Sequence, residues 1–192
     1  THGYGLVMSP VAEVTPQGLP RFLLADIPPR PRDVDLVVTR PEIYYGELTN
    51  HYVVVGTRTP DFEFSYPSGD DNVRTTYRGT GGVPLHSFFR RAAFAARFQT
   101  INLLLSDEIT STTRILFRRN ITERLQTLAP FLRFDSDPYA VLADGRLFWI
   151  VDAYTTTLGF PYAMPHARWQ ANYVRNAVKA VVDAYNGTVH FY

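Results

Sequence analysis

The stretch Arg78-Gly-Thr-Gly-Gly-Val-Pro84, with the segment that follows it as far as Phe134, decides the fold that we expect. It is the only long region with helical periodicity. Pro84 suits a first helical position, where a missing N–H costs nothing. Apolar residues then recur at helical spacing on one stripe: Leu85, Phe88, Phe89, Ala92, Ala93 and Ala96. We therefore expect a first helix over about 84–105.

A second helix is predicted over about 112–129. Ser111, Thr112 and Thr113 are all suitable N-caps, and Pro130 would end the helix. The core stripe of this helix would consist of Ile115, Ile121, Leu125 and Leu128.

The first of these segments is long and apolar, but its charges argue against a transmembrane helix. Arg90, Arg91 and Arg97 each cost roughly 2.5–3.5 kcal/mol near a bilayer centre, which outweighs several Leu or Phe residues. A buried amphipathic helix is the better interpretation.

Hairpin signals surround the helical region. Asp144-Gly145 lies between the apolar runs 139–143 and 146–154, and Asn186-Gly187 lies between 172–185 and 188–192. Antiparallel hairpins around a central helical pair predict an α+β fold rather than α/β. Residues 1–192 would form a single domain, with 1–36 as a loosely attached, extended or β-rich arm.

Composition limits the function classes. The chain has 192 residues, a hydrophobic content of 45% and a net charge of +1. This content supports a real core, and the charge favours no nucleic-acid partner. The chain contains no cysteine, which excludes disulfides and thiolate chemistry.

Several segments carry a family resemblance: Tyr66-Pro-Ser-Gly-Asp-Asp-Asn72, Tyr77-Arg-Gly-Thr-Gly-Gly-Val83, Ile101–Asp107, Arg114–Asn120, Phe131–Tyr139, Ala143–Leu147 and Val181–Tyr185. The chain resembles uncharacterised protein family number 0182, of bacterial multi-pass membrane proteins. The resemblance implies an extracytoplasmic portion of a larger protein of the cell membrane, preceded there by membrane helices. It brings no activity and no functional residues. The implied partner is the membrane-spanning remainder of the same protein, with a homo-oligomer as a further possibility.

Gly79, Gly81 and Gly82 are candidates for anion binding, because backbone N–H groups before a helix can cradle an anion. No Gly-Lys-Ser/Thr follows, so the segment is not a P-loop. A simple turn into the helix is the favoured interpretation.

Acidic residues give two further sets of candidates. Asp70 with Asp71, and Asp135 with Asp137, could bind a divalent cation, although turn formation explains them better. Asp152 and Asp183 occupy matching places in the segments 150–154 and 181–185 (Ile-Val-Asp-Ala-Tyr and Val-Val-Asp-Ala-Tyr). If the two strands are close, the carboxylates could divide acid and base roles. Polar residues satisfied on a sheet face are the favoured alternative.

Two function classes remain. The first is a non-catalytic binding, assembly or gating module without a cofactor, for which a large exposed apolar patch would speak. The second is a carboxylate- or metal-assisted hydrolase that acts on cell-envelope material. Convergent carboxylates in a deep pocket, or a bound divalent ion, would favour this second class. Trp149, Trp169 and Tyr173 could line a groove, but core packing is favoured.

Overall fold

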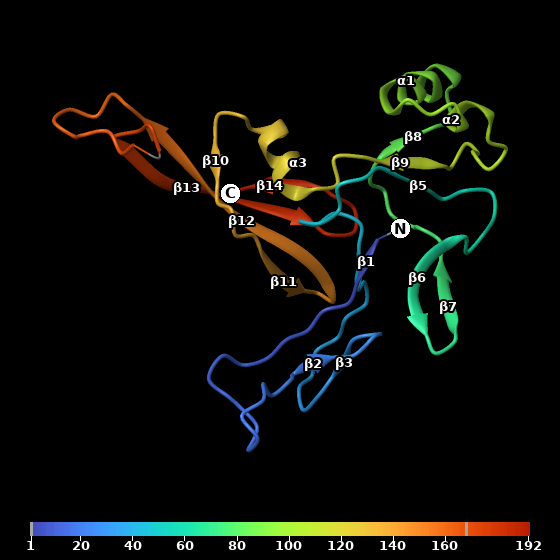
Figure 1. The fold of residues 1–192 in the computed structure, drawn as a ribbon, viewed down its shortest axis with the longest axis horizontal. Coiled ribbons are helices and arrows are strands. Elements are labelled where there is room, and N and C mark those ends of the chain that lie inside the picture. The colour runs from blue at the N-terminus through green and yellow to red at the C-terminus, as the bar shows by residue number, and fades with distance from the viewer. Residues whose placement is uncertain (1, 168) are drawn as a thin grey trace.

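The fold is dominated by small antiparallel sheets (Figure 1). It is seen in a computed structural model that describes residues 2–167 and 169–192. Within this part of the chain the structure has fourteen strands and three short helices. None of these helices is long and apolar enough to cross a membrane.

The largest sheet contains both hairpins expected from the sequence. Its strands are β10 (Arg133–Phe134), β11 (Tyr139–Ala143), β12 (Arg146–Thr157), β13 (Tyr173–Asp183) and β14 (Val189–Phe191). The order is β10-β12-β13-β14, and β11 also pairs with β12. Asp144 and Gly145 both have positive φ, as a two-residue hairpin turn of this type requires.

The inner face of this sheet packs into the main core. Val151, Ala153, Val182 and Ala184 are all buried, as strand alternation predicts. The core also holds four tyrosines and two residues of helix α3 (Ile121–Leu128): Tyr44, Tyr45, Tyr77, Tyr185, Ile121 and Leu125.

The predicted central pair of helices, and with it the α+β fold class, was wrong. Instead of one helix over 84–105 there are two short ones, α1 (Phe88–Phe98) and α2 (Asn102–Leu105). Helix α1 ends at Gln99, which adopts the left-handed conformation. Instead of a helix over 112–129, the chain forms strand β9 (Arg114–Leu116) and then α3.

Non-local pairing explains the second correction. Strand β9 lies between β5 (Val53–Val55) and β8 (Val83–Pro84), so its backbone hydrogen bonds are made with distant segments. Pro84 therefore lies on an edge strand, where proline is tolerated, rather than at a helix start. The N-cap of α3 is Asn120, whose side chain accepts a hydrogen bond from the Glu123 N–H.

The face of α1 was also predicted wrongly. Ala95 is its buried residue, and Phe94 and Phe98 pack beside it against Ile115 and Leu103. Phe88 and Phe89, which were expected in the core, are exposed.

Six short strands complete the fold. They pair as β1 (Gly3–Tyr4) with β4 (Glu42–Ile43), β2 (Leu24–Ala25) with β3 (Arg30–Pro31), and β6 (Glu63–Ser68) with β7 (Asp71–Thr75). In Figure 1 the β2–β3 region lies at the lower edge, apart from the large sheet.

Candidate functional site

The most distinctive surface of the molecule is the far end of the β12–β13 hairpin, residues 158–167 and 169–174, which we call the hairpin end. In Figure 1 it projects at the upper left, away from the other elements. Residues 173–177 of β13 are exposed on both faces, so this part of the ribbon is uncovered. Its exposed apolar side chains are Leu158, Phe160, Tyr162, Met164, Tyr173 and Val174. Such a cluster is costly to leave in water and marks interaction surfaces.

Asn172 gives the hairpin end a defined shape. Its side chain accepts a hydrogen bond from the Phe160 N–H at 3.1 Å, and it donates to the carbonyl groups of Phe160 and Ala163. The Phe160 and Tyr173 rings stack with centroids 5.2 Å apart. These contacts hold the segment 160–163 against Asn172 and Tyr173, which lowers the entropy cost of docking.

A pocket of about 730 Å³ lies between the base of the hairpin end and the α3–β10 connection. Its lining includes Arg133, Asp135, Tyr154 and Trp169. The Tyr154 hydroxyl donates to Asp135 Oδ2 at 3.2 Å, and burial followed by this contact raises the pKa of Tyr154. Asp135 is the one carboxylate among the lining residues, so this pocket does not assemble a carboxylate pair.

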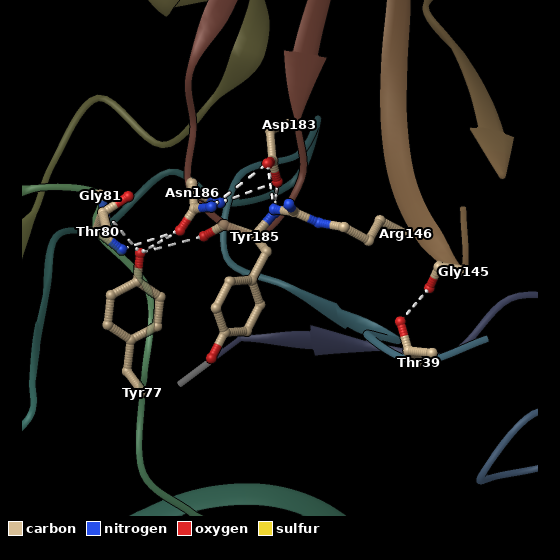
Figure 2. Close-up of polar contacts among 9 residues, drawn as sticks. All are labelled: Thr39, Tyr77, Thr80, Gly81, Gly145, Arg146, Asp183, Tyr185 and Asn186. Carbon is tan, nitrogen blue, oxygen red and sulfur yellow. Dashed lines mark hydrogen bonds and ion pairs between the residues drawn. The ribbon is translucent and has the colours of Figure 1, made fainter. Parts of the chain in front are cut away.

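Two backbone N–H groups of the glycine loop donate to protein acceptors. The N–H of Thr80 donates to Asn186 Oδ1 at 3.0 Å, and the N–H of Gly81 donates to the Tyr77 hydroxyl at 3.0 Å (Figure 2). The loop carbonyls accept from Arg114, which spans Thr80, Gly81 and Gly82. The Thr80 N–H thus joins the loop to the β13–β14 turn, and the Gly81 N–H is used by Tyr77.

Close packing explains the glycines themselves. A Cβ at Gly79 would lie 2.3 Å from the Tyr77 hydroxyl, and one at Gly81 would lie 2.2 Å from the Asn186 carbonyl oxygen. Gly82 has φ of +74°, which a residue with a side chain rarely adopts. The glycines serve close approach and a left-handed turn.

The structure does not bring Asp152 and Asp183 together. Asp183 pairs with Phe148 across the strands, four residues from Asp152, so the two positions are roughly 13 Å apart along the strand. Asp152 pairs with Lys179, and hydrogen bonding from that ammonium lowers the pKa of the Asp152 carboxyl. Asp183 is buried, pairs with Arg146 and accepts the N–H groups of Tyr185 and Asn186 (Figure 2).

The other acidic candidates occupy turns. Asp70 and Asp71 lie at the exposed tip of the β6–β7 hairpin. Asp135 accepts the N–H of Asp137 at 3.3 Å, a local turn contact. Across residues 2–167 and 169–192, no group of three or more His, Asp or Glu side chains is placed to hold a metal ion.

The aromatic candidates divide between core and surface. Trp149 packs against the main core, and its indole N–H donates to the Tyr45 carbonyl at 2.9 Å. Trp169 lines the 730 Å³ pocket, and Tyr173 belongs to the hairpin end. The apolar run Leu158-Gly-Phe-Pro-Tyr-Ala-Met164 was the overlooked signal, because loops between strands are ordinarily polar.

Comparison with known proteins identifies relatives across the whole chain. The model of an uncharacterised protein family, UPF0182, matches residues 1–192. A UPF0182 protein of Pelotomaculum thermopropionicum is 54% identical over 192 residues, and one of Geobacter sulfurreducens is 55% identical over 193 residues. Both alignments cover 100% of this chain but 21% of the relative. No solved structure matches the chain.

Proposed function

This chain belongs to the uncharacterised protein family UPF0182, and we propose that it is a non-catalytic, extracytoplasmic assembly module of a multi-pass membrane protein. The observation that carries the proposal is the hairpin end, an exposed apolar surface on a projecting ribbon. The partner that binds the hairpin end is the remainder of the same protein.

The length of the relatives supports the remainder of the same protein as the partner. The chain spans about one fifth of the length of the curated relatives that it matches, so most of such a protein lies outside it. An intramolecular partner needs no high affinity of its own, because linkage supplies a large effective concentration. The resemblance to membrane proteins seen in the sequence supports an extracytoplasmic position beside membrane helices.

A second exposed apolar surface supports contact with the remainder of the protein at more than one place. Phe88, Phe89, Ile101 and Leu105 are exposed on α1, α2 and the turn between them. The alternative function, a carboxylate-assisted hydrolase, receives less support. The expected pair, Asp152 and Asp183, is separated, and each carboxylate has a basic partner.

The test is photo-crosslinking in the full-length protein. A benzophenone amino acid replaces Tyr162, whose side chain is fully exposed, and a control carries it at Leu48, which is also 92% exposed but lies outside the hairpin end. We expect the full-length protein in the membrane fraction, with position 162 crosslinked to a segment of the same polypeptide outside this chain. We expect position 48 to give little product.

Three outcomes would contradict the proposal. They are recovery of the full-length protein in a soluble fraction, crosslinking of position 162 to lipid or to a second copy instead of the same polypeptide, and equal yields at positions 162 and 48.

A further inference from the structure

Three arginines from separate parts of the sequence converge on a pocket of about 240 Å³ beside the glycine loop. Arg40 precedes β4, Arg78 begins the loop, and Arg146 begins β12. The lining also includes Thr39, Thr80 and Asn186. We propose that this pocket binds a phosphate-type oxyanion, held by arginine side chains and not by the glycine N–H groups.

The positive charge of the pocket is only partly neutralised by protein groups. Arg146 pairs with Asp183, and the Arg146 Nε remains buried without a hydrogen-bond partner. Arg40 has its guanidinium carbon 5.1 Å from the centroid of the Tyr185 ring. Within the described residues, the Arg78 side chain has no hydrogen bond or ion pair, and Arg40 has no carboxylate partner.

Other charged groups also lie near the pocket, among them Arg114, which donates to the Thr80 carbonyl. Besides Asp183, the neighbouring acidic groups are Glu42 and Glu63. Both raise the pKa of Tyr185, whereas Arg40 lowers it. Glu63 is buried and accepts three hydrogen bonds elsewhere. The Arg40 and Arg78 guanidinium groups have no ion-pair partner among the described residues, and an anion between them would relieve their mutual repulsion.

The backbone around the pocket is fixed. The Thr39 N–H donates to the Gly145 carbonyl at 2.8 Å. The Thr39 hydroxyl donates to the same carbonyl at 2.9 Å (Figure 2). The Arg78 N–H donates to the Tyr185 hydroxyl at 3.1 Å. The segments that carry the three arginines are therefore joined to one another before a ligand arrives, which favours binding.

The donors favour phosphate over carboxylate. The Arg40 and Arg78 guanidinium groups and the Thr80 hydroxyl, which makes no hydrogen bond within the described residues, come from separate segments. Donors spread around a site match the several oxygens of a tetrahedral anion, and arginine is the preferred side chain for phosphate. The volume lies below the roughly 300–1,000 Å³ of drug-sized sites, so a free anion or a single headgroup fits.

Titration calorimetry of this chain with sodium phosphate at low ionic strength tests the proposal. We expect saturable binding that weakens with added salt. Arg78→Gln should weaken it at least about tenfold, because a hydrogen-bonded charge pair is lost. Arg58→Gln is the matched control, since Arg58 is exposed, has no side-chain partner among the described residues and lies outside the pocket. Thermal unfolding verifies that both variants fold.

A second arm distinguishes the source of the phosphate. Flotation is measured with vesicles that mix phosphatidylglycerol and phosphatidylcholine, and with vesicles of phosphatidylcholine alone. Binding of inorganic phosphate that depends on Arg78 supports a free anion, and binding only to the anionic vesicles, again dependent on Arg78, supports a lipid headgroup. The proposal is overturned if neither probe binds, or if Arg58→Gln weakens binding as much as Arg78→Gln.

Discussion

Glu63→Ala is expected to destabilise the chain by roughly 3–6 kcal/mol, because three buried or half-buried donors lose their acceptor. Glu63 is only 4% exposed, and its carboxylate accepts from the Tyr44 hydroxyl at 2.7 Å, the Gly56 N–H at 3.2 Å and the Tyr77 N–H at 3.1 Å. Burial, followed by this carboxylate, raises the pKa of Tyr44, so its hydroxyl remains a donor. The loss is a large part of the about 5–15 kcal/mol that stabilises a typical domain.

Urea unfolding measures this effect, with Glu63→Gln as the control. The glutamine oxygen can still accept from the two N–H groups, and its amide can donate to the Tyr44 oxygen. Glutamine should therefore retain most of the stability. An alanine variant within about 1 kcal/mol of the original chain would refute the assigned role, since one unsatisfied buried donor alone costs about that much.

Gly82→Ala is expected to cause the second large loss of stability, because a backbone cost and a packing cost add. A residue with a side chain that adopts φ of +74° lowers the free energy of unfolding by about 1–2 kcal/mol. The new Cβ would also lie 2.3 Å from Leu116 Cδ2 and 2.6 Å from the Ile115 carbonyl oxygen, and overpacking of this kind costs roughly 1–3 kcal/mol more.

Gly18→Ala separates these two costs. Gly18 has φ of +78° and no atom within 4 Å of an added Cβ, so only the backbone cost applies. Thermal unfolding should show a much larger loss for Gly82→Ala than for Gly18→Ala. Equal losses would mean that close packing of the glycine loop against β9 contributes nothing.

The parts of the fold that the sequence predicts correctly rest on local chemistry. Asp144-Gly145 supplies two residues that tolerate positive φ, and this alone places the β11–β12 hairpin. Strand alternation likewise predicts that Val151 and Val182 point into the core. Neither inference needs knowledge of a distant segment.

The parts that fail depend on distant partners. Arg114–Leu116 is a strand because Val53–Val55 and Val83–Pro84 lie on its two sides, which helical spacing cannot reveal. The pocket arginines 40, 78 and 146 share no local pattern and meet only in the folded chain. The proposed anion pocket lies beside the glycine loop that the sequence indicated, but its candidate ligands are the charged side chains and not the glycine N–H groups.

The claim that the hairpin end packs against the remainder of the larger protein is tested most directly by thiol labelling. The chain has no cysteine, so Tyr162→Cys and Leu48→Cys each introduce one thiol into it, and both positions are fully or almost fully exposed. In the isolated chain the two thiols should react at similar rates with a maleimide. In the full-length protein, with any cysteine outside this chain replaced, we expect position 162 to react at least about tenfold more slowly while position 48 is unchanged, since a buried thiol is shielded from the reagent. Equal reactivity of position 162 in the isolated chain and in the full-length protein would contradict the account.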